Sequence, residues 1–173
     1  MADSLDIKWT NLERVLNEFA DEVIDLARQH LDANGTNATH NLYDSMEKIV
    51  EIGEDYYKVS ISLADYWRYV EEGRGPGKYP PPSVIENWIE IKPVSPYPGV
   101  DGKVPSVKQL TFLISRKIAN EGTEAQPFLE PAVEEVLSRY ETIIDQAIDD
   151  DVYEFINEAV IRHRKTSLER NNY

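Results

Sequence analysis

The sequence predicts an α+β fold, in which a small antiparallel β-sheet packs against an N-terminal helix and further short helices lead to a long C-terminal helix. Apolar residues recur every three or four positions over Thr10–Ala33 and again over Val133–Val160, but they alternate with polar residues over Tyr56–Leu63. With 173 residues, 41% of them hydrophobic, the chain suffices for one packed core. We expect residues 1–136 to form the α+β domain and residues 137–173 to form a helical extension continuous with it.

The first helix carries both a start signal and a stop signal. Thr10 and Glu13 fit a capping box, in which the two side chains bond to free backbone N–H groups at the helix start. Asn34-Gly35 follows the helical pattern and offers a position that tolerates positive φ, which is a common way to end a helix. The sequence therefore predicts a helix over Thr10–Ala33.

Two segments, residues 42–52 and 56–63, are predicted to pair as a β-hairpin. The second segment alternates apolar and polar side chains, as a half-buried strand does, and the first is less regular but rich in β-branched residues near its end. Gly53-Glu54-Asp55 supplies a short polar turn between them. Packing the hairpin against the first helix would bury the apolar faces of both.

Short helices and loops follow the hairpin. A helix is predicted over Ala64–Glu72, ended by Gly73, and a second helix is predicted to start at Ser83. The proline-rich stretch Pro93–Pro105 is predicted to be a loop. Ser106 is predicted to cap a third helix. The apolar residues expected on the buried side of this third helix are Val107, Leu110, Leu113, Ile114 and Ile118.

The last helix is predicted to begin near Pro131 and to keep an apolar stripe as far as Val160. Such a stripe is longer than one small domain covers, so part of it is expected to contact another subunit. Asp149-Asp150-Asp151 lacks the ligand spacing and turn glycine of a calcium loop. It is therefore predicted to be a solvated helix face, and is the point at which the helix could be interrupted. The polar residues Lys165–Tyr173 are predicted to fray.

Composition narrows the class of protein. The chain has no cysteine, so disulfides, thiolate zinc sites and cysteine nucleophiles are excluded. It has no apolar run of about 18 residues and no signal-peptide pattern, so no membrane segment is expected. The formal net charge of −14 is opposite to the basic footprint that tight, sequence-specific DNA binding requires. The acidic charge either keeps the protein soluble or repels DNA that passes beside it.

The glycine-rich stretch from Gly73 to Lys78 has two interpretations. Glycines with nearby cations suggest a phosphate loop, which presents backbone N–H groups to an anion at a helix start. The prolines at 80–82 remove three such donors where the anion would need them. The alternative is a structural loop whose cationic side chains, Arg74 and Lys78, face a partner.

No catalytic, cofactor-binding or metal-binding residue is predicted. His30, His40 and His163 lie too far apart in the sequence to form a local metal motif. Glu71 and Glu72 do not form an acid–base pair, because neighbours on a helix point about 100° apart. The sequence has no G-x-S-x-G nucleophile elbow.

Trp67 also has two interpretations. It lies off the helical side formed by Tyr66, Tyr69 and Val70. It is therefore either a core residue or an anchor in an interface, a role that Trp and Tyr often fill.

Two motifs resemble a known family. Tyr69-Val70-Glu71-Glu72-Gly73 is similar to a Tyr-rich segment that ends in a Val-Glu-x-Gly-like turn. Gly122-Thr123-Glu124-Ala125-Gln126-Pro127-Phe128-Leu129-Glu130-Pro131-Ala132 is similar to a Gly-Thr-x-x-x-Pro-Phe-Leu-x-Pro-Ala stretch before a terminal helix. With the order of elements from about Leu12 to Val136, these motifs resemble the HK97-type family of tailed-bacteriophage neck and tail-completion (head–tail joining) proteins. The inserted residues 75–105 and the long last helix depart from the family pattern.

The resemblance implies a structural virion protein rather than an enzyme, with no cofactor. It implies a homo-oligomeric ring at the head–tail junction that contacts other neck, connector or tail-tube proteins and lines the passage for double-stranded DNA without reading its sequence. The expected location is the neck or tail of the virion, and the host cytoplasm during assembly. The expected structural residues are Gly73, Gly122, Pro127, Phe128 and Leu129, of which the last two are expected to anchor the terminal helix. The residues expected to contact a neighbouring subunit are Trp67, Arg74, Lys78 and Tyr79.

A competing class is a small acidic binding or inhibitor module that acts on a basic or nucleic-acid-binding partner. Its acidic surface would imitate the phosphates of a nucleic acid. That class predicts a compact acidic patch on a monomer or dimer, whereas the virion class predicts self-association and co-purification with particles.

Overall fold

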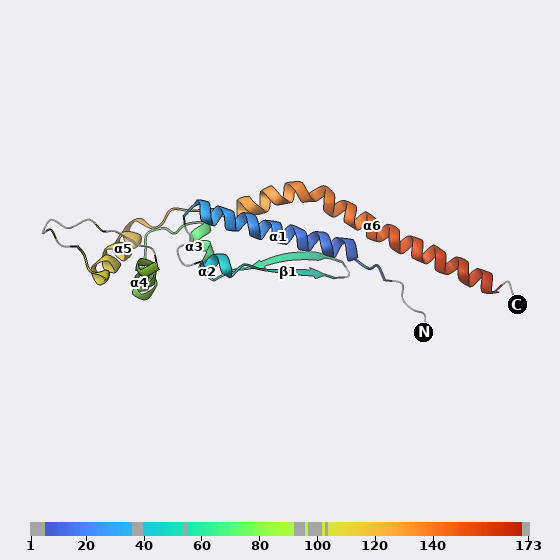
Figure 1. The fold of residues 1–173 in the computed structure, drawn as a ribbon, viewed down its shortest axis with the longest axis horizontal. Helices are drawn as coiled ribbons and strands as arrows, with labels where there is room; N and C mark the ends of the chain where they lie inside the picture. Colours follow the sequence, from blue (N-terminus) through green and yellow to red (C-terminus); the bar gives the residue numbers. More distant parts are fainter. Residues whose placement is uncertain are drawn as a thin grey trace. The chain divides into compact units, whose positions relative to one another are not determined.

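The computed structural model describes residues 6–35, 40–53, 55–91, 96, 102 and 104–170. Its elements confirm the α+β class, because an N-terminal helix, a two-stranded antiparallel hairpin, short helices and a long C-terminal helix follow one another (Figure 1). The chain divides into two compact units: unit 1 comprises residues 1–24, 48–61 and 133–173, and unit 2 comprises residues 25–47 and 62–132.

The core of unit 1 is formed by three elements. Helix α1, Thr10–Ala33, and helix α6, Glu130–Arg170, pack together, and each contributes to both units. The hairpin of β1, Glu47–Ile52, and β2, Tyr57–Ser62, packs against the same core. One buried cluster comprises Leu12, Val15, Leu16, Ile144 and Ala147, against which Trp9, Val50, Ile52, Val59, Tyr140 and Ile148 are partly buried.

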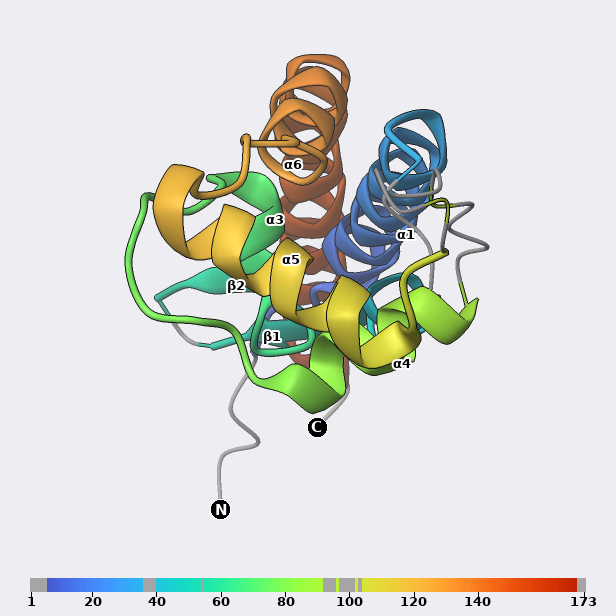
Figure 2. The same cartoon turned by 90° about the vertical axis from the view of Figure 1, so that its left-hand side faces the viewer.

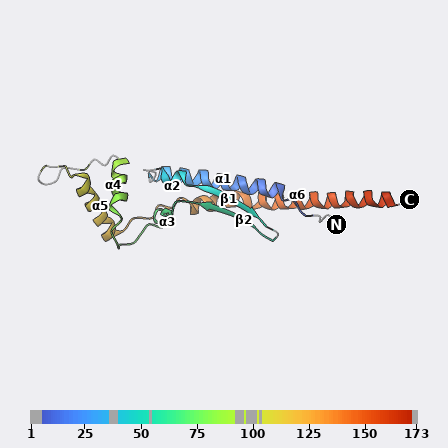
Figure 3. The same cartoon turned by 90° about the horizontal axis from the view of Figure 1, so that it is seen from below.

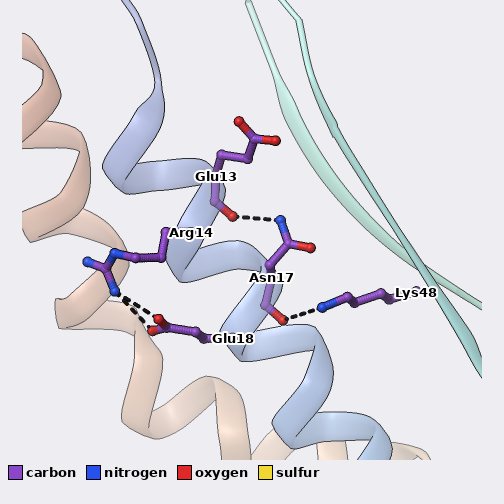
Figure 4. Close-up of polar contacts among 5 residues, drawn as sticks. All are labelled: Glu13, Arg14, Asn17, Glu18 and Lys48. Carbon is purple, nitrogen blue, oxygen red and sulfur yellow. Dashed lines mark hydrogen bonds and ion pairs between the residues drawn. The ribbon is translucent and has the colours of Figure 1, made fainter.

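Polar contacts hold the hairpin closed and tie it to α1. The Gly53 N–H donates to the Tyr56 carbonyl at 2.8 Å across the turn. From β1, the Lys48 ammonium donates to the Asp21 carboxylate at 2.6 Å. It also donates to the Asn17 carbonyl at 3.4 Å (Figure 4). The predicted pairing of the hairpin with the first helix is therefore confirmed.

The first strand is shorter than predicted, because residues Asn41–Asp44 form helix α2. Leu42 and Met46 are buried, but Asp44, which would share their face in a strand, is exposed, so the burial does not follow a strand period. His40 precedes α2 with a φ of 51°, in the left-handed region. The expectation of a strand from Leu42 was therefore wrong, and strand structure begins at Glu47.

The side chain of Asp151, on α6, caps the N-terminus of α1. Its Oδ1 accepts the backbone N–H of Asn11 at 2.9 Å and the side-chain amide of Asn11 at 2.8 Å. Its Oδ2 accepts the N–H of Leu12 at 2.9 Å. Only 1% of Asp151 is exposed. The first N–H groups of a helix have no partner within the helix, so one buried carboxylate satisfies two of them and fixes α1 against α6.

The structure of α1 and α6 corrects four predictions. Thr10 lies within the helix rather than before it, and the Glu13 N–H donates to the Trp9 carbonyl at 3.0 Å, so the predicted capping box is wrong. Asp149 and Asp150 are exposed as expected, but Asp151 is buried rather than solvated. Helix α6 continues through the acidic run and as far as Arg170, so it is not interrupted there and does not fray from Lys165 as predicted; residues 171–173 lie outside the described residues.

We expect Asp151→Ala to lower the free energy of unfolding by about 2 kcal/mol, because it leaves buried N–H groups at a helix start without an acceptor. The matched control is Asp150→Ala, on the exposed neighbour, which is expected to change it by less than about 0.5 kcal/mol. Urea denaturation followed by circular dichroism measures both. Equal losses for the two variants would show that the cap contributes nothing.

Tyr140 joins α6 to α1 by a second polar contact. Its ring meets Phe19 edge to face, with ring centroids 5.6 Å apart. Burial raises the pKa of the Tyr140 phenol above its ordinary value, and the hydrogen bond to the Glu22 carboxylate raises it further. The phenol O–H donates a hydrogen bond to the Glu22 carboxylate. The Glu22 carboxylate also pairs with Arg139.

Unit 2 contains three further helices: α3, Trp67–Glu71; α4, Pro82–Ile91; and α5, Val107–Glu121. Helices α4 and α5 pack on one another (Figure 2). The prediction that Ser106 caps α5 is confirmed, because its hydroxyl accepts the Gln109 N–H in a capping box. Most of the predicted loop over Pro93–Pro105 lies outside the described residues.

The predicted buried side of α5 was partly wrong. Its buried residues are Thr111, Ser115 and Ala119, while Val107 and Leu113 are exposed. The buried side of α5 is therefore formed by small side chains at four-residue spacing, and its larger apolar side chains are not fully buried.

No described helix is long and apolar enough to cross a membrane.

Candidate functional site

Glu71 brings the two motifs of the sequence together within unit 2. Its Oε2 accepts the N–H groups of Phe128 at 2.9 Å and Leu129 at 3.0 Å, and its Oε1 accepts the N–H of Glu130 at 2.9 Å. The first motif supplies the carboxylate and the second supplies three consecutive N–H groups. One side chain, 7% exposed, therefore caps the start of α6.

The location of Glu71 explains how a glutamate is tolerated in the interior. The start of a helix carries unpaired N–H groups and a partial positive charge, and both favour a carboxylate. Hydrogen bonds to an ionised acceptor are stronger than those between neutral groups. Sequence reasoning weighed Glu71 only as half of an acid–base pair with Glu72 and so missed this role. The available signal was Pro131, which marks a helix start that needs a cap.

Gly73 and Gly122 lie where the two motifs cross. Their φ angles are 71° and 80°, in the left-handed region. A Cβ atom on Gly73 would lie 2.5 Å from the Thr123 carbonyl oxygen, and one on Gly122 would overlap the Arg74 carbonyl oxygen. The backbones of Arg74 and Thr123 exchange two hydrogen bonds there, of 3.1 and 2.8 Å. Only glycine allows so close a crossing at these angles.

The loop that follows Gly73 is held by its own chain. The Arg74 guanidinium donates to the Lys78 carbonyl at 2.7 Å, which closes the loop on itself. The Gly77 N–H donates to the Ala119 carbonyl at 2.8 Å. Two of the N–H groups that a phosphate loop would present, those of Arg74 and Gly77, are therefore already used. The geometry favours the structural interpretation of this loop over the phosphate-binding one.

The second motif is also fixed to the C-terminal part of α1. The His30 Nδ1 donates to the Phe128 carbonyl at 3.1 Å, and the Asn34 amide donates to the Pro127 carbonyl at 3.3 Å. Phe128 is completely buried and Leu129 is partly buried. The segment from Pro127 to Leu129 is thus held through its carbonyls by α1 and through its N–H groups by Glu71.

The four residues predicted to contact a neighbouring subunit differ in their exposure and in their contacts within the chain. Lys78 and Tyr79 are exposed. Arg74 is partly buried, and its guanidinium belongs to the loop closure. Trp67 is partly buried, with the Arg68 guanidinium 5.5 Å from its ring centre. Among the four, the structure therefore leaves Lys78 and Tyr79 most accessible to a neighbour.

Helices α4 and α5 carry exposed apolar side chains that the sequence did not predict, because several of them, such as Val107 and Leu113, were expected to be buried. We call these side chains together the α4–α5 surface. Large apolar side chains are exposed on both helices. Its exposed members are Val84, Ile91, Val107, Phe112 and Leu113.

The described residues contain no group of three His, Asp or Glu side chains that could hold a metal ion. An open groove of about 400 Å³ in unit 1 is lined mostly by apolar and aromatic side chains, with Asp55 as its carboxylate. A lone carboxylate in an aromatic groove provides no paired acid and base.

Comparisons with protein-family models, with characterised proteins and with solved structures find no match for this chain.

Proposed function

We propose that this protein is a structural component of a bacteriophage neck or tail, which assembles as a ring at the head–tail junction and lines the DNA passage. The observation that carries the proposal is the joint made by Glu71, Gly73 and Gly122. The two motifs on which the family resemblance depends meet there through three hydrogen bonds and a close backbone crossing.

A rigid joint of this kind suits a protein that must hold a fixed angle to its neighbours. A ring closes only when every subunit meets its neighbour at the same angle. The joint fixes the start of α6 and the loop from Arg74 to Tyr79 within one unit, so the groups expected to meet a neighbour are held in a constant arrangement. The exposed α4–α5 surface supplies apolar area for such contacts. The net charge of −14 suits a wall along which DNA passes without binding.

The test is the mass of the purified protein by light scattering, with negative-stain images of the same fraction and of that fraction mixed with neck and tail proteins of the virion. We expect a closed ring with a central opening, alone or on those partners, and no gel shift of duplex DNA at physiological salt. A monomer that joins no virion protein but binds a basic protein tightly would overturn the proposal and favour the acidic inhibitor.

A charge reversal at Lys78 tests whether this residue contacts the neighbouring subunit of the ring. Lys78→Glu reverses the charge of an exposed side chain and is expected to reduce ring assembly at least tenfold without changing the circular dichroism spectrum. Lys58→Glu, on the hairpin, is the charge-matched control and is expected to assemble normally. Arg74→Glu is less informative, because the Arg74 guanidinium also closes its own loop. Equal assembly of both variants would remove Lys78 from the interface.

A further inference from the structure

We propose that the C-terminal segment of α6, Val152–Leu168, is a self-association surface on which two copies of this chain pair in antiparallel orientation. The pairing differs from ring closure and does not rest on the proposed function. It follows from three observations: an uncovered length of helix, an apolar stripe on a new side of it, and a division of charge along it.

The C-terminal segment lies beyond the elements that cover the rest of α6 in unit 1. Asp151 caps the first turn of α1, so α6 runs on past the start of α1 (Figures 1 and 3). After Asp151, no side chain described on α6 is buried. Ile156 is 51% exposed and Val160 is 43% exposed. Solvated helices usually carry polar residues on all sides, so this exposure calls for a partner.

The apolar stripe on the C-terminal segment is not a continuation of the seam with α1. At about 100° per residue, its centre lies about a third of a turn around the helix from the side that carries Ile144, Ala147 and Asp151. A partner that covered it would therefore lie on another side of α6 than α1 does. The residues of the stripe are Val152, Phe155, Ile156, Ala159 and Val160.

Charge divides this end of α6 into two halves. The stretch before Val160 carries Asp149, Asp150, Glu154 and Glu158, and the stretch after it carries Arg162, Arg164 and Lys165, all of them exposed. Within the part of the chain that the structure describes, no ion pair is formed by the three cations. Among the described residues, this segment therefore presents an acidic half and a basic half, neither of which forms an ion pair.

The separation of acidic and basic residues along the segment favours an antiparallel over a parallel pair. A parallel pair would place acidic half on acidic half and basic half on basic half, which is repulsive. An antiparallel pair centred near Val160 places Glu158 opposite Arg162 of the second copy. Glu158 and Arg162 lie on the same flank of the stripe, and like flanks meet in an antiparallel pair. A twofold pair makes each such contact twice.

The expected affinity is modest. The segment is about 25 Å long, which is short for an interface of standard size, so we expect a dissociation constant in the micromolar range. Because exposed ion pairs are screened by salt, the constant should rise between about 50 and 500 mM salt.

The first test is sedimentation of the full-length protein over a concentration series. Val160→Glu places a charge on the stripe and is expected to raise the dissociation constant of the pair at least tenfold. Ile161→Glu is the matched control, since it changes the adjacent exposed residue on another side of the helix. Unchanged sedimentation in Val160→Glu, or an equal effect of both variants, would overturn the assignment of the surface.

Charge reversal tests the pairing of specific residues. Glu158→Arg alone and Arg162→Glu alone are each expected to weaken the pair, because each places like charges opposite one another. The double variant Glu158→Arg/Arg162→Glu restores opposite charges in an antiparallel pair and is expected to recover the wild-type constant. A double variant no tighter than the singles would overturn the proposed register.

Disulfide cross-linking tests the antiparallel orientation of the two copies. A cross-link can be detected even when the pair is part of a larger assembly. The chain has no cysteine, so Val152→Cys and Ser167→Cys each introduce a unique thiol. In the antiparallel pair the two positions lie opposite each other, while two copies of Val152 lie about 23 Å apart along the axis. A disulfide is expected only when the two variants are mixed. A disulfide within Val152→Cys alone would show a parallel pair and overturn the proposal. A ring in which the mixture forms no disulfide would overturn this pairing while leaving the proposed function intact.

Discussion

Gly122→Ala is expected to lower the free energy of unfolding by about 4 kcal/mol or more, a large share of the roughly 5–15 kcal/mol of an ordinary domain. Two costs add. An alanine at a φ of 80° is strained, which costs about 1–3 kcal/mol. Its Cβ would also overlap the Arg74 carbonyl oxygen, and backbone cannot move aside as a flexible side chain does. Guanidinium denaturation followed by circular dichroism measures the loss.

Gly75→Ala is the control for this variant. It lies in the same loop region, yet a Cβ there meets nothing within 4 Å. We expect a change of less than about 1 kcal/mol, of either sign. Gly73→Ala should behave like Gly122→Ala, because its Cβ would meet the Thr123 carbonyl from the other side of the crossing. Wild-type stability of Gly122→Ala would show that the two motifs do not cross as described.

Glu71→Ala is expected to lower the free energy of unfolding by about 3 kcal/mol. The change removes an acceptor from three N–H groups at the start of α6, and buried N–H groups left without a partner are costly. Glu71→Gln keeps the shape but replaces one oxygen with an N–H₂ group that cannot accept, so we expect a smaller loss of about 2 kcal/mol. Chemical denaturation of the purified variants measures both losses.

Hydrogen exchange identifies the cause of that loss. In Glu71→Ala the amides of Phe128, Leu129 and Glu130 should exchange faster than those in the middle of α6, because their acceptor is gone. Glu72→Ala is the matched control on the exposed neighbouring glutamate, and it is expected to leave both stability and exchange within about 0.5 kcal/mol of wild type. Selective protection of these three amides in Glu71→Ala would contradict the cap.

The sequence predicted the elements whose apolar period is long and regular. Helix α1 has the bounds expected from its apolar period and Asn34-Gly35, and Ser106 caps α5 as its side chain suggests. The second strand was identified by its alternation. Periodicity failed where it was short: residues 42–44 were assigned to a strand although they belong to the short helix α2, because a few residues fit both periods.

The sequence by itself determined the α+β class, the order of the elements and the two glycine-containing motifs, because these depend on local period, backbone freedom and composition. Only the tertiary structure decided what Glu71 and Asp151 do. Each has an acidic neighbour of the same kind in the sequence, and no local rule separates Glu71 from Glu72 or Asp151 from Asp150. The difference lies in which carboxylate the fold carries to the start of a helix far along the chain, where free N–H groups take the place of water.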